Sequence, residues 1–262
     1  MSRLIFTVYD EVLDPDVTDF KKKQLKDYKD ILTTKQSEYA SKCNAEYKVV
    51  NSKKDKYDNI QFSKIKLLRQ FTESYKEVLY LDLDVVPSKS CSNIFEQYNF
   101  DKLVCFYEDC DKRLFDLFPK PKAKFKYIST LDHMSWWIKM AAKNSMLMLD
   151  DYSTSNYIIN TGVLGGSYDV IKNLEFEENF NDMINLLEES KDDNLYPQET
   201  AQHFRPNNEI FLTYLVEKNK TPSEKIDESW NYILDDMRSN WPDNVNLFHV
   251  ISKEFSLLEK FL

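Results

Sequence analysis

The chain has 262 residues, of which 42% are hydrophobic and 30% are charged, and its formal net charge is −9. This apolar content is enough for a folded core and excludes general disorder, and the length allows one large α/β domain or two small ones. The acidic balance makes general binding of nucleic-acid phosphates unfavourable, so we expect no nucleic-acid partner. A phosphorylated ligand would instead need positive charge gathered locally, by side chains or by a metal ion.

Hydrophobic spacing predicts the secondary structure of the first part of the chain. A short apolar run at 3–9 is typical of a buried strand, and helical spacing of apolar residues follows at 16–43. A second strand is expected at 46–50, a second helix at 61–75, and a near-continuous apolar strand at 78–83. The order β-α-β-α-β predicts a doubly wound α/β arrangement.

The remainder of the chain is less regular, and it contains no repeat, linker or low-complexity tract. We expect one domain with an irregular second half. The further elements predicted are a short helix near Ile94, strands at 103–107, 157–164 and 245–250, helices at 132–148, 169–190 and 208–219, and a short closing helix.

The chain is unusually poor in glycine. Its only glycines are Gly162, Gly165 and Gly166, whereas an average usage of ~7% predicts about 18. We expect them to serve a tight turn or a close backbone approach, with Gly165 and Gly166 forming a turn. The lack of glycine elsewhere excludes a G-x-G-x-x-G dinucleotide loop and a P-loop.

Cysteine usage and hydropathy indicate the compartment. The chain has four cysteines, Cys43, Cys91, Cys105 and Cys110, which form no C-x-x-C pair, so zinc-ribbon and thioredoxin-like sites are disfavoured. The N-terminal segment lacks the apolar stretch of a signal peptide, and the longest uncharged stretch, 152–168, is too polar to cross a bilayer. We therefore expect a cytoplasmic protein without a transmembrane segment.

The sequence YLDLDVV at 80–86 carries the sharpest chemical signal. Alternation along a strand would put Asp82 and Asp84 on the same side, at the carboxyl end of a central strand where open α/β sheets bind ligands. Two carboxylates at such a short distance repel each other unless a cation lies beside them. Mg²⁺ or Mn²⁺, shared with phosphate oxygens of a ligand, would relieve that repulsion. The alternative is a solvated strand end with two ordinary acids.

This segment resembles a known family. FSKIKLLRQF, YKEVLYLDLDVV and NIFE together are similar to the central segment of nucleotide-sugar-dependent glycosyltransferases of the GT-A fold, most of all glycosyltransferase family 8, the galactosyl- and glucosyltransferase and glycogenin group. Three further stretches agree in order: IINTGVLGG at 158–166, PNNEIFLTYL at 206–215 and LFHVISK at 247–253. The resemblance implies a Rossmann-like, mixed and mostly parallel sheet flanked by helices.

The same resemblance implies one catalytic domain over 1–262, with a nucleotide-sugar half at about 1–110 and an acceptor half at about 111–262. It implies Asp82, Asp84 and His249 as ligands of Mn²⁺ or Mg²⁺, and carboxylates with a neutral imidazole suit such an ion. Lys253 would neutralise a diphosphate. The lysine comes sooner after the histidine than in the family, and Ser252 stands where the family has glycine.

Further residues are implied to contact the donor. Lys64 matches the basic residue that touches the donor sugar or diphosphate, although Lys66 or Arg69 could take that role. Uracil and ribose would lie at the end of the first strand, where an aromatic ring can stack on a base and a carboxylate can accept from base or ribose. The remaining donor-binding residues implied are Thr7, Tyr9, Asp10, Leu83, Asn160, Thr161 and Gly162.

For catalysis, the resemblance points to Asn160, Asn208 and Glu209. Asn208 stands where the family often has glutamine near the anomeric carbon, and Asn160 matches the asparagine of the family's F-N-A-G-V segment. Glu209 could accept from a sugar hydroxyl, or it could be an acid in the first turn of a helix, where acids suit the helix dipole. Asn207 replaces the family's aspartate.

The expected activity is metal-dependent transfer of a sugar from a nucleoside-diphosphate donor, for which the resemblance implies a UDP-sugar, to a hydroxyl acceptor such as a glycan. Retention of configuration is expected, by same-face attack rather than by a double displacement through Glu209. Trp136, Trp137 and Tyr127 could stack on acceptor sugars or pack in the core, and a lysine-rich loop at 120–126 could meet an anionic partner. A nucleotidyl- or phosphoryl-transfer enzyme and a catalytically idle sugar- or protein-binding relative remain as alternatives.

Overall fold

A computed structural model describes most of the chain and divides it into two compact units. The first comprises Met1–Phe106, Thr161–Lys172 and Ser223–Leu262, and the second comprises Tyr107–Asn160 and Asn173–Pro222. The residues described are 2–9, 18–51, 60–109, 135–192, 195–234 and 242–258. None of the helices in these ranges is both long and apolar enough to cross a membrane.

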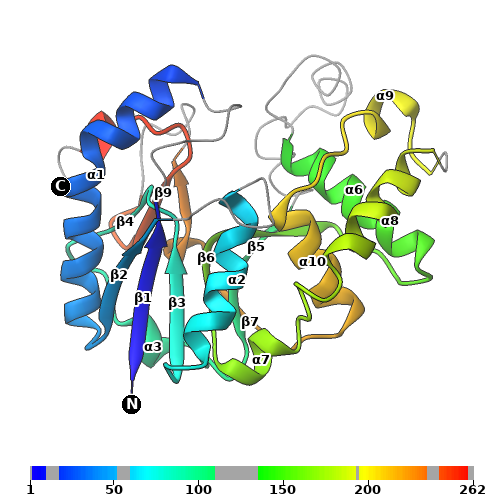
Figure 1. Cartoon of the computed structure of the whole chain (residues 1–262). Helices are drawn as coiled ribbons and strands as arrows, with labels where there is room; N and C mark the ends of the chain where they lie inside the picture. The colour runs from blue at the N-terminus through cyan, green and yellow to red at the C-terminus, as the bar shows by residue number, and fades with distance from the viewer. Residues whose placement is uncertain are drawn as a thin grey trace. The chain divides into compact units, whose positions relative to one another are not determined.

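Six strands form one sheet in the order β2-β1-β3-β6-β5-β7 (Figure 1). Strand β1 pairs in parallel with β2 and β3, and β5 pairs in parallel with β7, whereas β3 and β6 are antiparallel. The bounds are β1 Arg3–Val8, β2 Glu46–Val50, β3 Glu77–Leu81, β5 Leu103–Asp109, β6 Tyr157–Gly166 and β7 Ser223–Ile226. This mixed, mostly parallel sheet confirms the α/β class expected from the sequence.

Two helices cover opposite faces of the first three strands: α1 (Asp19–Lys42) and α2 (Ile60–Thr72). Ile5 of β1 packs in one apolar cluster with Tyr39 of α1 and with Cys43, which follows the helix directly. The next residue, Phe6, points the other way, and its ring centroid lies 4.9 Å from that of Phe71 in α2. Successive side chains of a strand point to opposite faces, so the two helices sandwich the sheet, as alternating βαβ units require.

A second, three-stranded sheet completes the first unit. Strand β9 (Leu247–Val250) lies between β4 (Val85–Pro87), which is antiparallel to it, and β8 (Tyr232–Leu234), which is parallel to it. The late strand predicted at 245–250 is therefore confirmed. This small sheet places the segment after Asp84 beside the C-terminal strand, and it positions the candidate site. The short elements α3 (Ile94–Gln97), α7 (Tyr168–Lys172), η2 (Glu228–Trp230) and η3 (Phe255–Leu258) also belong to this unit.

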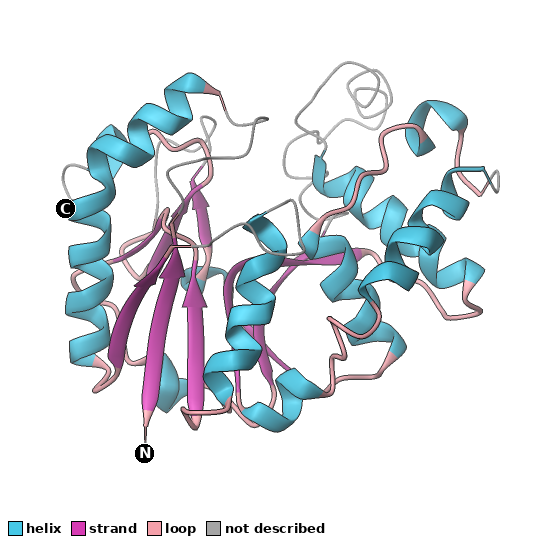
Figure 2. Ribbon diagram, viewed as in Figure 1, coloured by secondary structure: helices cyan, strands magenta, loops and turns pink. Residues whose placement is uncertain are grey.

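The second unit is mainly helical (Figure 2). Its helix α6 packs against both α8 and α10. Lys143 of α6 is fully buried, and its ammonium donates to the Glu217 carboxylate at 2.9 Å and to the Ser155 hydroxyl at 2.6 Å. Removal of one partner would leave an uncompensated buried charge, so this pair fixes α6 against α10. The helices are α6 (Ser135–Leu149), α8 (Phe180–Asp192), α9 (Gln198–Ala201) and α10 (Asn208–Lys218).

Two predictions about local structure are wrong. The single helix expected at 169–190 is broken into α7 and α8, and Glu175 between them has a φ of 51°, in the left-handed region that helices avoid. Gly165 and Gly166 do not form a turn, because both lie inside β6 opposite Leu79 and Val78, and no glycine has a positive φ. The alternative expectation of close backbone approach is confirmed for this pair.

The space around Gly165 explains why glycine is needed there. A Cβ atom at this position would lie 2.6 Å from the Phe100 ring and 2.9 Å from the carbonyl oxygen of Val78. At Gly166, a Cβ would lie 2.8 Å from a methyl carbon of Val170. The glycines therefore allow β6 to pack tightly onto its neighbours.

Of the four cysteines, Cys43, Cys91 and Cys105 are buried free thiols, as expected for core cysteines. Some predicted features lie outside the described residues. They are Cys110, Asp10, Tyr127, the side chain of Trp136 and the lysine-rich loop at 120–126.

Candidate functional site

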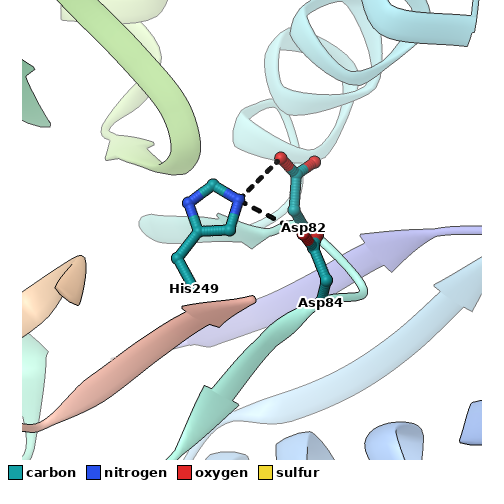
Figure 3. Close-up of side chains that lie close together, drawn as sticks. All are labelled: Asp82, Asp84 and His249. Carbon is teal, nitrogen blue, oxygen red and sulfur yellow. Dashed lines mark ion pairs between the residues drawn. The ribbon is translucent and has the colours of Figure 1, made fainter. Parts of the chain in front are cut away.

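The acidic pair lies in a tight turn that follows β3. The amide N–H of Val85 donates to the carbonyl oxygen of Asp82 at 2.9 Å, which closes the turn Asp82-Leu83-Asp84-Val85. Alternation along a strand was predicted to bring the two carboxylates together. That prediction is wrong, because β3 ends at Leu81, before the acidic pair. The convergence itself is present: the turn directs both carboxylates to the same side (Figure 3).

Strand β9 brings His249 to this turn. His249 stands opposite Val85 in the antiparallel pairing of β4 and β9, and the amide of Val250 donates to the carbonyl oxygen of Asp84 at 3.0 Å. The Nε2 atom of His249 lies 3.4 Å from Asp84 Oδ2 and 3.9 Å from Asp82 Oδ2 (Figure 3). One ligand atom from each residue lies within 4.8 Å of the others. The structure thus brings together the three side chains predicted to hold a metal ion.

Two lysines neutralise the acidic pair. Lys253 donates to Asp84 Oδ2, and Lys64 Nζ lies 3.1 Å from Asp82 Oδ1. The Asp84 side chain is only 4% exposed, whereas that of Asp82 is 26% exposed. Burial alone would raise the pKa of the Asp84 carboxyl, but Lys253 and His249 outweigh burial and hold its pKa well below the usual range. Asp84 is therefore ionised and available as a ligand.

Asp82 is oriented by its neighbours on β3 and α2. The Tyr80 hydroxyl donates to Asp82 Oδ1, the same oxygen that Lys64 contacts. Burial, followed by the Asp82 charge, raises the pKa of Tyr80 well above its usual value, so the hydroxyl keeps its proton. With Oδ1 engaged in this way, Oδ2 is the oxygen that faces His249.

Thr161 and Gly162, near the end of the IINTGV stretch at 158–163, also meet the turn. The amide N–H of Asp82 donates to the carbonyl oxygen of Gly162 at 2.8 Å, and Lys64 Nζ donates to the carbonyl oxygen of Thr161 at 3.3 Å. Lys64, Lys66 and Arg69 of α2 were the candidates for the basic residue at the donor, and Lys64 contacts the acidic pair. Thr161 and Gly162 therefore lie at the site through their main chain.

Three predicted donor-binding residues lie at the ends of β1 and the turn. Thr7 is fully buried, and its hydroxyl has no hydrogen-bond partner among the described residues. Tyr9 and Leu83 pack in the same apolar cluster, and the Lys29 ammonium lies 4.5 Å from the centroid of the Tyr9 ring. Tyr9 is only 6% exposed, so its ring contributes to the core. Asp10 cannot be placed, since it lies outside the described residues.

The predicted catalytic residues belong to the second unit. Asn160 lies in β6, and Asn208 and Glu209 form the first turn of α10. Each of these three residues is at most 9% exposed. The Asn207 side chain caps this helix by accepting from the Glu209 amide at 2.8 Å. Glu209 also forms an ion pair with Lys139 of α6, a partner that the sequence did not indicate.

Two buried side-chain amides at the acidic turn were not predicted from the sequence. Gln36 of α1 contacts the main chain of the turn, and Asn231 contacts His249. Gln36 did leave a signal, because it stands on the buried face of α1 between Leu32 and Tyr39, where an apolar residue is expected. Asn231 precedes a three-residue strand that the hydrophobic pattern did not predict.

The cluster fits a divalent cation. Two carboxylates suit Mg²⁺ or Mn²⁺, and an imidazole is an acceptable third ligand for Mn²⁺. His249 Nδ1 lies 2.9 Å from Asn231 Oδ1, so this nitrogen donates and Nε2 is the nitrogen that could bind a cation. Asp82, Asp84 and His249 therefore offer a donor set that could hold such an ion.

No protein-family model and no curated protein matches the chain. Several solved structures do. One is a glycosyltransferase involved in glycosylating the major capsid of PBCV-1, with 12% identity, a TM-score of 0.47 and 98% of each chain covered. Another is the galactosyltransferase LgtC in complex with donor and acceptor sugar analogs, with 12% identity, a TM-score of 0.48, and 95% of this chain and 87% of that chain covered.

A third is mouse xyloside xylosyltransferase 1, with 10% identity, a TM-score of 0.49, and 96% of this chain and 98% of that chain covered. All three are glycosyltransferases, the class of enzyme that the sequence motifs resemble. At this identity and score the likeness concerns the backbone, and it assigns neither a donor nor an acceptor to this chain.

Proposed function

We propose that the protein is a metal-dependent glycosyltransferase that moves a sugar from a nucleoside-diphosphate donor, a UDP-sugar above all, to a hydroxyl acceptor such as a glycan. The observation that carries this proposal is the convergence of Asp82, Asp84 and His249, with a lysine on each carboxylate. Anionic ligands for a divalent cation and fixed positive charges at the same point suit a diphosphate. That the diphosphate carries a sugar is inferred from the resemblance of the sequence motifs to glycosyltransferases.

The chemistry requires departure of a nucleoside diphosphate from the anomeric carbon. A divalent ion held by Asp82, Asp84 and His249 would supply charge neutralisation at the leaving phosphate. Lys253 and Lys64 donate hydrogen bonds at the same place, and in the donor complex these ammonium groups bind diphosphate oxygens. Because negative charge on the leaving group grows in the transition state, such contacts accelerate the reaction rather than only tighten binding.

The nucleoside is proposed to bind at the end of β1. Thr7 lies in this strand, its hydroxyl has no hydrogen-bond partner among the described residues, and the motif resemblance implies it as a donor contact. Tyr9 contributes an aromatic edge rather than an open face, because its ring is packed in the core and the Lys29 ammonium lies over it.

Asn160, Asn208 and Glu209 are proposed to contact the transferred sugar. An amide can both donate to and accept from sugar hydroxyls. Glu209 is proposed as a hydrogen-bond acceptor, and its ion pair with Lys139 supports this because a carboxylate oxygen engaged by an ammonium is a weaker nucleophile. Retention of configuration is what the motif resemblance implies, and without a nucleophilic Glu209 it is proposed to occur by same-face attack, with the departing phosphate taking the acceptor's proton.

One observation favours a second candidate, a catalytically idle relative that binds a sugar or nucleotide without a cation. Lys64 and Lys253 already neutralise the charges of Asp82 and Asp84. If the lysines are never displaced, the protein would bind nucleotides with no need for Mn²⁺.

Release of nucleoside diphosphate from a panel of nucleotide sugars, with Mn²⁺ or with a chelator, separates these candidates. The matched variant replaces both Asp82 and Asp84 by Asn, which removes the anionic ligands and keeps side-chain size. We expect turnover of a UDP-sugar only by the wild-type protein with a divalent ion. Turnover in chelator by the double variant would refute the metal assignment, and binding without turnover for every donor would favour the idle relative.

A further inference from the structure

Gln36 of α1 makes a buried clamp on the acidic turn. The side chain is fully buried, and its amide nitrogen donates to the carbonyl oxygen of Asp82 at 2.9 Å and to that of Val85 at 2.8 Å. Both N–H bonds of the amide are thus used on the first and last residues of the turn. The amide oxygen accepts from the Tyr47 hydroxyl at 2.9 Å, which fixes the orientation of the amide.

This clamp acts where the turn most needs support. Asp82 and Asp84 carry like charges on a four-residue turn, and their repulsion favours conformations in which the two carboxylates separate. The turn's own main-chain hydrogen bond, from Val85 to Asp82, is a single contact. Gln36 ties down the Asp82 and Val85 carbonyls with a neutral group, which does not compete with a cation for the carboxylates.

A second buried amide acts on the third ligand. Asn231 is fully buried at the end of η2, and its Oδ1 lies 2.9 Å from His249 Nδ1. An acceptor at this distance keeps a proton on Nδ1, so Nε2, which lies on the Asp84 side, is the nitrogen that could bind a cation. The Asn231 Nδ2 group has no hydrogen-bond partner among the described residues, so this amide is kept buried at a cost.

We infer that Gln36 and Asn231 are positioning residues that pre-organise the cation site, Gln36 through the main chain of the acidic turn and Asn231 through the His249 tautomer. The inference rests on the cation site of the proposed function. Groups that orient metal ligands in this way contribute about 10–100-fold to metal affinity. Neither residue belongs to the group Asp82, Asp84 and His249 that offers the ligand atoms.

The competing explanation is that both amides only fill the core. Gln36 lies on the buried face of α1 with Leu32 and Tyr39, and its replacement would then lower the free energy of unfolding without changing ion binding by the folded protein. The two explanations differ in one readout, the affinity for Mn²⁺ measured per folded molecule in the absence of any nucleotide.

The experiment titrates Mn²⁺ alone into the full chain and detects the free ion by electron paramagnetic resonance, with circular dichroism and melting curves to give the folded fraction. Gln36→Met keeps the length of the side chain and removes both donors, and we expect Mn²⁺ affinity to fall about 10–100-fold. Tyr47→Phe removes only the hydroxyl that orients Gln36, and we expect a smaller fall of several-fold. Thr72→Val, which removes a buried hydroxyl bond to Arg69 elsewhere in the same unit, is the matched control and should leave affinity unchanged.

Asn231 provides a test that does not depend on whether Gln36→Met folds. Asn231→Leu removes the acceptor at Nδ1 and should weaken Mn²⁺ binding about 10–100-fold, whereas Asn231→Asp keeps an acceptor there and should restore binding to within a few-fold. Wild-type affinity in Gln36→Met, Tyr47→Phe and Asn231→Leu would overturn the inference and leave the proposed function standing. Failure of the wild-type protein to bind Mn²⁺ would overturn the cation site and the inference with it.

Discussion

Lys253 donates to the same carboxylate oxygen of Asp84 that lies 3.4 Å from Nε2 of His249. The chain turns sharply after β9 to reach this position, since Lys253 has a φ of 62° and its amide donates to the carbonyl oxygen of Val250 at 2.9 Å. In the cation-free protein the ammonium is therefore the counter-ion of Asp84. A divalent ion that uses this oxygen competes with Lys253 for it.

Replacement of Lys253 tests this competition. In Lys253→Met, Asp84 loses its counter-ion, so we expect Mn²⁺ affinity without nucleotide to rise about tenfold or more, the equivalent of one charge-assisted hydrogen bond. Affinity for UDP in the presence of Mn²⁺ should fall, because the ammonium is then missing from the diphosphate. Calorimetric titration of each ligand measures both. A lower Mn²⁺ affinity in this variant would show that Lys253 supports the ion rather than competes with it.

Lys64 should act on the donor rather than on the ion. In Lys64→Met we expect UDP affinity with saturating Mn²⁺ to fall about tenfold, because one charged hydrogen bond to the diphosphate is lost. Lys66→Met, two residues further along the same helix, is the control and should bind UDP as the wild type does. Equal losses in the two variants would mean that the effect comes from the net charge of α2.

Glu209 is expected to work as a hydrogen-bond acceptor for the transferred sugar. Glu209→Gln should lower kcat about 10–100-fold, the range of a hydrogen bond to a charged group, and leave Mn²⁺ affinity unchanged. Lys139→Met should lower kcat as well, since it removes the ion-pair partner that holds the carboxylate in place. A glycosyl adduct on Glu209, detected by mass spectrometry during turnover, would instead establish a double displacement.

Gly165 is expected to be structurally essential. In Gly165→Ala the added methyl group meets the Phe100 ring and the Val78 carbonyl oxygen, and overpacking of this kind costs about 1–3 kcal/mol in the free energy of unfolding. Gly166→Ala meets the ends of the Val170 and Ile171 side chains, which can move, so its cost should be smaller. Urea unfolding of the two variants compares these costs, and equal stability of Gly165→Ala and the wild type would contradict the packing.

Much of the fold follows from hydrophobic spacing. Strands at 3–9, 46–50 and 78–83 and helices at 16–43 and 61–75 were predicted within a few residues, because each element buries one continuous apolar face. The three-residue strands β4 and β8 were not predicted, since so short a segment carries no period, and their pairing with β9 is a contact distant in the sequence.

The candidate site was predicted in its members more than in its geometry. Asp82, Asp84, His249, Lys64 and Lys253 do lie together, as the motif resemblance implied. Strand alternation was the wrong explanation for the convergence of the acidic pair. The D-x-D sequence forms a turn, and the main-chain hydrogen bonds of this turn replace those of a strand ladder. A glutamine on the apolar face of a helix conflicts with the local hydrophobic pattern, and such conflicts are expected at functional sites. A search for polar residues at apolar positions would have found Gln36.

The proposed function depends on a divalent ion held by Asp82, Asp84 and His249, through which a nucleoside diphosphate binds. Calorimetric titration of UDP into the protein, with Mn²⁺ and then with a chelator, tests it most directly. Asp82→Asn is the matched variant, since Asp82 is the more exposed of the two acids and its loss should disturb the fold least. We expect UDP binding by the wild type that needs Mn²⁺ and is lost in Asp82→Asn. UDP affinity that is the same with Mn²⁺, with chelator and in the variant would contradict it.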